Sequence, residues 1–175
     1  VTIAVQSTNI LVINPAIPAK SLSELIAYAK ANPGKLTFAS QGMGSTGHLF
    51  GEQLKHLAGI DITHVPYRGP GPAVQDVIAG QVSMVFDAMT AARPQIRAGR
   101  VRALAIASAQ RDALVPEVPT AAELGFPQIQ GKAWFGFFAP AKTPPDVVAW
   151  LYTRAKESFT REESRARLAQ QGISV

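Results

Sequence analysis

The 175-residue sequence has no cysteine, few charged residues and no long apolar run, and each shortage excludes a class of protein. Without cysteine the chain has no disulfide, no thiol nucleophile and no thiolate ligand for a metal. No stretch of about 18 apolar residues is present, so we expect no membrane insertion. Charged residues make up 17% and hydrophobic residues 47%, which is typical of a folded domain.

The polar residues that are present give no sign of a metal centre or of a nucleic-acid surface. The three histidines, His48, His56 and His64, lack acidic partners at metal-ligand spacing, so we expect no metal and no cofactor. The net charge is +5, but the basic residues are scattered. Their densest cluster, at 154–167, is interleaved with glutamates and is typical of a solvated helix face. Val1 begins a strand-like segment directly, so no signal peptide is expected in this chain.

Strand-like and helical segments alternate along the chain, which predicts an α/β fold with an open, mostly parallel sheet flanked by helices. Two capping boxes, Ser21–Glu24 and Thr120–Glu123, mark the beginnings of helices. The expected strands are 10–14, 36–40, 63–67, 81–87, 102–107 and 133–139, with a strand start in 171–175. The expected helices are 22–31, 48–57, 72–79, 91–98, 120–124 and 143–156, with a last helix from 160.

The two ends of the chain predict a second, incomplete unit. Residues 1–11 and 133–175 are apolar enough to need a sheet to join, whereas the middle of the chain supplies its own sheet. We therefore expect one complete lobe at about 12–132 and part of another lobe at 1–11 and 133–175. The chain would cross between the lobes near 12 and near 132.

Two glycine-rich loops follow expected strands and precede expected helices. Loops at this place meet ligands beyond the carboxyl ends of the strands, and the first turn of a helix leaves N–H donors that attract an anion. A doubled loop favours a ligand held by backbone amides, especially a carboxylate, although tight turns alone would also use these glycines. The expected ligand residues of the first loop are Ser40, Gly42, Gly44, Ser45, Thr46, Gly47 and His48, and those of the second are Tyr67 and Gly69.

Other kinds of site fit these residues less well. Residues 42–47 match G-x-G-x-x-G, but a dinucleotide site needs an acidic residue after the next strand, where Tyr67 and Arg68 stand. The serine at 45 is not in the G-x-S-x-G arrangement of hydrolases, and the phosphate-binding Gly-Lys-Ser/Thr is missing. Asp87, at the end of the third strand, has three readings: a general base, a partner for a ligand hydroxyl or ammonium, or a cap of the next loop. Trp134 is the second aromatic residue, after Tyr67, expected near the crevice.

Three motifs together carry a resemblance to a known family. They are G-x-G-S-x-x-H-L at 42–49, H-V-P-Y-R-G at 64–69 and F-G-x-F-A-P-x-x-T-P-P at 135–145. In these motifs, and over nearly all of residues 11–175, the sequence resembles the Bug receptors, the extracytoplasmic solute receptors of tripartite tricarboxylate transporters.

The resemblance implies a two-lobed periplasmic binding protein of the type II arrangement, which closes over its ligand without catalysing a reaction. It also implies a periplasmic location, membrane permease subunits as partners, and a carboxylate ligand: a dicarboxylate, tricarboxylate, amino acid or aromatic acid. The family's first-lobe glycine loop has no match here, so the chain resembles a fragment that lacks most of the first lobe. Two other functions stay open: a sensing module of the same fold and, less favoured without an acid–base pair, an enzyme.

Overall fold

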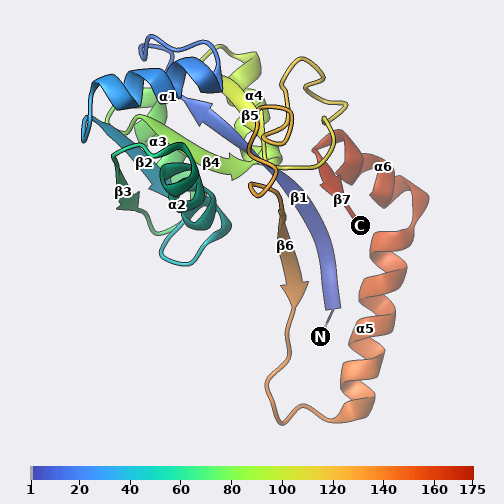
Figure 1. The fold of residues 1–175 in the computed structure, drawn as a ribbon. Coiled ribbons are helices and arrows are strands. Elements are labelled where there is room, and N and C mark those ends of the chain that lie inside the picture. The colour runs from blue at the N-terminus through green and yellow to red at the C-terminus, as the bar shows by residue number, and fades with distance from the viewer. Residues whose placement is uncertain (1) are drawn as a thin grey trace.

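The computed structural model describes residues 2–175, with side chains from residue 4 on. Residues 9–131 form a head, in which helices flank a sheet. A long arm, which consists of residues 2–8 and 132–160, extends from it (Figure 1). The strands are β1 Thr2–Ile13, β2 Leu36–Ser40, β3 Ile62–Pro66, β4 Met84–Ala88, β5 Arg102–Ile106, β6 Lys132–Phe137 and β7 Ile173–Ser174. The helices are α1 Leu22–Ala31, α2 Thr46–Ala58, α3 Pro70–Ala79, α4 Met89–Arg97, α5 Pro145–Thr160 and α6 Glu162–Gln170.

The sheet of the head has the strand order β3-β2-β4-β1-β5. β2 pairs in parallel with β3 and with β4, whereas β1 runs antiparallel to both β4 and β5. Four strands therefore share one direction and β1 opposes them, so the sheet is mixed. The α/β sheet flanked by helices is as predicted, and the one reversed strand is what brings the chain in from the arm.

Helices cover both faces of this sheet, and each face has its own core. On one face Leu25 of α1, Phe38 of β2 and Leu54 of α2 pack together, all nearly inaccessible to solvent. On the other face Val77 of α3 and Met89 of α4 pack against the sheet. Burying a side chain of this size stabilises the fold by roughly 1.5–3 kcal/mol. The two cores hold β2, β3 and β4 rigidly, and so fix the loops that follow these strands.

The two predicted capping boxes form, but only one begins a helix. The Ser21 hydroxyl accepts the Glu24 N–H at 3.1 Å, and the Glu24 carboxylate accepts the Lys20 N–H at 2.7 Å, as α1 begins. Thr120 and Glu123 bond to each other: Thr120 Oγ1 accepts the Glu123 N–H at 3.1 Å and the Glu123 carboxylate accepts the Thr120 N–H at 2.7 Å, yet residues 121–125 form turns. The helix predicted at 120–124 is therefore wrong.

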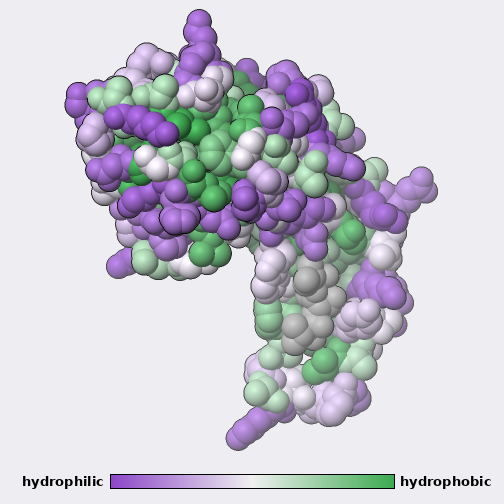
Figure 2. Space-filling view, in the orientation of Figure 1, coloured by the Kyte–Doolittle hydropathy of each residue, from purple (hydrophilic) through white to green (hydrophobic). Residues whose placement is uncertain are grey.

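The arm is built on the first part of β1, which is much longer than the strand predicted at 10–14. Residues 2–8 of β1 pair antiparallel with β6, and Gln6 and Ser7 also pair with β7. No residue of α5 is buried. Hydrophobic side chains reach the surface in the middle of the head and at several places along the arm (Figure 2).

Candidate functional site

Three strand ends meet at one edge of the head sheet. β2, β3 and β4 are parallel, so the segments that follow β2 and β3, at 41–45 and 67–69, lie at the same edge as the end of β4, at 87–88 (Figure 1). Two of these segments lead into α2 and α3, each of which presents its N-terminus there. This is where the sequence predicts the ligand.

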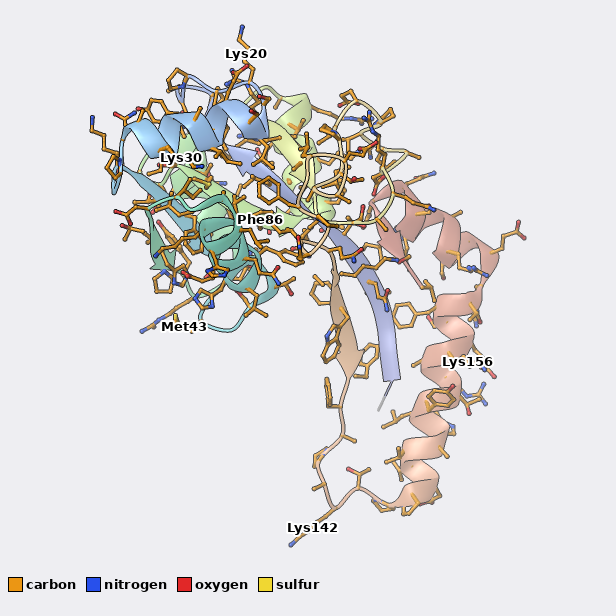
Figure 3. All side chains as sticks on the ribbon, viewed as in Figure 1. Lys20, Lys30, Met43, Phe86, Lys142 and Lys156 are labelled. Carbon is orange, nitrogen blue, oxygen red and sulfur yellow. The ribbon has the colours of Figure 1, made fainter. Side chains whose placement is uncertain are left out.

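The loop between β2 and α2 turns on two glycines in the left-handed region, Gly42 with φ +126° and Gly44 with φ +76°. Ser45 caps α2: its hydroxyl accepts the His48 N–H at 3.3 Å and donates to the Gly42 carbonyl at 2.7 Å. The first turn of α2 has no acidic residue, so nothing on the helix offsets its positive end. Met43, at the tip of the loop, points away from the head (Figure 3).

Gly47, in the first turn of α2, is held against the floor of the site. A β-carbon at this position would lie 2.6 Å from Gln41 Oε1 and 2.7 Å from the Phe86 carbonyl. Gln41 in turn donates to the Phe86 carbonyl at 3.0 Å and to Asp87 Oδ1 at 3.2 Å. The glycine is therefore required by the close packing of α2 on β4.

The second loop lies beside the first. Gly69 is the N-cap of α3 with φ +123°, the helix begins with Pro70, and its first turn has no acidic residue. The Tyr67 N–H donates to the Ser40 carbonyl at 3.0 Å, and a β-carbon on Gly42 would lie 3.5 Å from the Tyr67 carbonyl. The two loops therefore touch through their backbones.

Tyr67 is fixed by α3. Its hydroxyl donates to Asp76 Oδ2 at 2.6 Å, and burial, followed by this bond and the charge of Asp76, raises the pKa of Tyr67 to about 12. The phenol therefore stays protonated at neutral pH and holds its loop on the helix.

Asp87 lies at the end of β4 with 1% of its surface exposed. Burial raises the pKa of its carboxyl to about 6, against the lowering by the hydrogen bonds from the Ala88 N–H and Gln41. Its Oδ2 has no hydrogen-bond partner within residues 2–175. In this structure the side chain braces Gln41 beneath the first loop.

Sequence reasoning missed His64, which lies directly under the first loop. Its Nε2 is 2.7 Å from the hydroxyl of Ser40, a fully buried residue, and its ring lies 4.3 Å from the ring of His48. The motif that begins at this histidine, H-V-P-Y-R-G, was the available signal. The partner Ser40 is 24 residues away, and only the pairing of β2 with β3 brings the two together.

Trp134 is the predicted site residue that lies apart from the rest. It is on β6 opposite Gln6, its side chain is 55% exposed, and its ring lies 6.2 Å from that of Phe138. The other predicted residues come together on the head: Ser40, Gly42, Gly44, Ser45, Thr46, Gly47, His48, Tyr67, Gly69 and Asp87.

The site has the chemistry of an anion receptor. The positive ends of α2, which Ser45 caps, and of α3, which has no side-chain cap, lie with a set of N–H and hydroxyl groups at one edge of the sheet. Among the described residues, no three His, Asp or Glu side chains gather as a metal site. None of the helices in residues 2–175 has the length and apolar character needed to cross a bilayer.

Residues 1–175 match the protein-family model described as tripartite tricarboxylate transporter family receptor. The "UPF0065 protein in tcbD-tcbE intergenic region" of Pseudomonas sp. (strain P51) is 40% identical over 100% of this chain and 52% of its own length. "Protein BugT" of Bordetella pertussis is 39% identical over 94% of this chain and 51% of its own length. The chain thus spans about half the length of these relatives.

Solved structures share the fold closely. Rpa4515 of R. palustris, solved with adipate, has a TM-score of 0.93 and 32% identity over 98% of this chain and 57% of its own. A structure described as a periplasmic transporter has a TM-score of 0.93 and 40% identity over 99% and 58%. MatC (Rpa3494) of Rhodopseudomonas palustris, with bound malate, has a TM-score of 0.92 and 36% identity over 99% and 59%.

Proposed function

The chain belongs to the family of tripartite tricarboxylate transporter receptors, and from this premise we propose that its protein captures a small carboxylate. The family comprises extracytoplasmic solute receptors rather than enzymes, which agrees with the non-enzymatic function predicted from the sequence. We further propose that the protein works in the periplasm and delivers its ligand to the membrane permease subunits of such a transporter.

One observation carries the proposal: α2 and α3 begin side by side, behind two glycine-rich loops that are joined by the Tyr67–Ser40 hydrogen bond. Each helix end offers backbone donors and a partial positive charge to an anion. Two such ends next to each other suit the two oxygens of a carboxylate. The binding of malate and adipate by two relatives supports a dicarboxylate of four to six carbons as the ligand class.

We propose that residues 12–132 form one lobe and that 1–11 and 133–175 belong to another, with the ligand between them. β1 supports a division of this kind, with the change of partner between residues 8 and 9: residues 9–13 pair with β4 and β5, whereas residues 2–8 pair with β6. A strand shared in this way suits hinge closure, in which the ligand stabilises the closed form by its higher affinity for it. Trp134, on β6, would approach the ligand from the second lobe.

Ligand binding by the full-length protein that contains this chain tests the proposal. Malate, adipate and their uncharged diamides are compared by calorimetry and thermal shift, and we expect binding of at least one acid and of neither diamide. If no carboxylate binds, or if a diamide binds as well as its acid, the proposal is wrong.

A pair of glycine variants tests whether the loop at 42–47 is the anion site. Gly44 and Gly99 both have φ near +70° and space for a β-carbon, but only Gly44 lies in the loop. Gly44→Asp places a negative charge there, and we expect at least about tenfold weaker binding of the acid, or about 1.4 kcal/mol. Gly99→Asp adds the same charge and the same backbone strain elsewhere and should leave the affinity unchanged. Equal effects of the two variants would contradict the assignment.

A further inference from the structure

The hydrogen bonds of the first loop converge on the peptide groups of Gly42 and on one buried hydroxyl. Ser40 Oγ accepts the Gly42 N–H at 3.2 Å and lies 3.1 Å from the Gly42 carbonyl. The same carbonyl accepts from the Ser45 hydroxyl at 2.7 Å. Ser40 is 0% exposed, so no water replaces a partner that it loses. The shape of the loop therefore depends on what holds the Ser40 hydroxyl in place.

His64 is what holds it. The ring of His64 stacks on Phe38, with centroids 4.8 Å apart, and its Nε2 lies 2.7 Å from Ser40 Oγ. On its other side it meets the ring of His48, whose Nδ1 accepts the Gly44 N–H at 3.2 Å. One imidazole thus contacts both ends of the loop, through Ser40 at its beginning and through His48 at its end.

We infer that His64 is a positioning residue, which holds the glycine-rich loop through Ser40 and His48 in the shape that receives the ligand. Only the part about receiving the ligand rests on the proposed function. The contacts of His64 with Ser40 and His48 hold the loop whether or not a carboxylate is the ligand.

The proton on His64 decides which way the Ser40 hydroxyl points. The hydroxyl has a single hydrogen, which goes to Nε2 when that atom is bare and to the Gly42 carbonyl when Nε2 carries a proton. A protonated imidazole always has a proton on Nε2, so acid adds a donor to the Gly42 carbonyl when the neutral ring carries its proton on Nδ1, and adds none when it carries it on Nε2. The charged groups that face His64 are all on α2: His48 and Lys55 lower its pKa, Glu52 raises it, and burial is the largest cause of the net lowering. Phe38 and Ser40 of β2 are uncharged.

Amide hydrogen exchange of the 175-residue chain tests the positioning role without any ligand. In His64→Phe, which cannot bond to Ser40, we expect the Gly42 amide to exchange roughly threefold to tenfold faster, while that of Leu54 in the core is unchanged. His64→Gln keeps a polar group near Ser40 and should restore slow exchange. His56→Phe, at an exposed histidine of α2, is the matched control and should have no effect. Equal Gly42 exchange in the wild type and His64→Phe overturns the inference.

The pH profile separates positioning from simple packing. Below pH 6.5 we expect the carbonyl carbon resonance of Gly42 to move downfield with the midpoint of the His64 imidazole. The step should be absent in His64→Gln and kept in His56→Gln. The nitrogen resonances of the His64 ring give the neutral tautomer, and the step is expected for Nδ1–H and not for Nε2–H. An Nδ1–H ring without the step, or an Nε2–H ring with it, overturns the inference.

Affinity in the full-length protein distinguishes failure of this inference from failure of the proposed function. With malate and adipate as probes, His64→Phe should weaken binding roughly threefold to tenfold, and His64→Gln should recover most of it. An unchanged affinity in His64→Phe overturns the role in binding while the receptor function stands. If neither acid binds even to the wild type, the proposed function fails and the exchange result still decides whether His64 positions the loop.

Discussion

The buried carboxyl of Asp87 makes the stability of the head depend on pH. Its pKa is raised from an ordinary 3.8 to about 6, chiefly by burial, so the folded state binds this proton more tightly than the unfolded state does. The stabilisation is complete below pH 3.8 and is lost as the pH rises through about 6. A shift of this size corresponds to about 3 kcal/mol at neutral pH. His64 acts in the opposite direction: its pKa is lowered, so its contribution is lost as the pH falls below 6.5.

Asp87→Asn should therefore remove a pH-dependent loss of stability. Between pH 4 and pH 7 the free energy of unfolding of the wild type should fall by about 2 kcal/mol more than that of the variant, because asparagine has no charge to bury and part of the loss already lies below pH 4. Urea unfolding at intervals across this range measures the difference. Asp146→Asn, at an exposed position of α5, is the control and should follow the wild type. Parallel curves for the wild type and Asp87→Asn would contradict the prediction.

At the scale of elements, the two helices that begin at the site differ in how closely they pack. The packing of α2 requires the glycine at 47, whereas α3 has room for a side chain at Gly71. A β-carbon on Gly47 would overlap Gln41 and the Phe86 carbonyl, whereas one on Gly71 would meet nothing within 4 Å. Neither glycine has a positive φ, so the two differ in packing alone.

We expect Gly47→Ala to destabilise the chain by roughly 1–3 kcal/mol, because α2 must move away from β4. Gly71→Ala should change stability by less than about 0.5 kcal/mol. Thermal and urea unfolding of the two variants give the comparison, and in the full-length protein Gly47→Ala should also weaken the binding of the acid. Equal stability of the two variants would contradict the prediction, because α2 could then move away from β4 without loss of stability.

The elements that sequence predicts well are those whose signals are local. The α1 capping box and the glycine-rich turns act within a few residues, so the strand–loop–helix units around the site are confirmed. The length of β1 has no local signal, because its first residues are strand only through pairing with β6, more than 120 residues away in sequence. The pairing of Ser40 with His64 is hidden for the same reason: it needs β2 and β3 to be neighbours. At 120–124 the capping hydrogen bonds form, but Gly125, with φ +91°, turns the chain before a helix develops.

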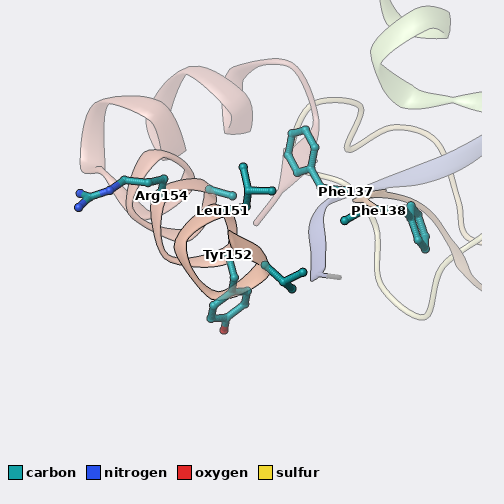
Figure 4. A pocket seen from close by; sticks show the side chains of 8 residues that line it. Phe137, Phe138, Leu151, Tyr152 and Arg154 are labelled. Carbon is teal, nitrogen blue, oxygen red and sulfur yellow. The ribbon is translucent and has the colours of Figure 1, made fainter. Parts of the chain in front are cut away.

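At the scale of the whole molecule, the arm exposes an apolar groove between β6 and α5. Its volume is about 480 Å³, and Phe137 and Leu151 face each other across it (Figure 4). Phe137 is 57% exposed and Leu151 46% exposed. Connected apolar surface of this kind marks a place of contact with other protein surface.

The 175-residue chain should therefore self-associate through its arm. We expect the double variant Phe137→Ser, Leu151→Ser to weaken association at least about tenfold, since each large apolar side chain contributes roughly 1.5–3 kcal/mol when it is buried. Light scattering coupled to gel filtration over a range of concentrations measures the change in mass. Leu49→Ser removes a comparably exposed apolar side chain from α2 in the head and should leave association unchanged. If Leu49→Ser disperses the chain as well as the double variant does, association is a general property of its apolar surface and not of the arm; if the double variant associates like the wild type, the contact lies elsewhere.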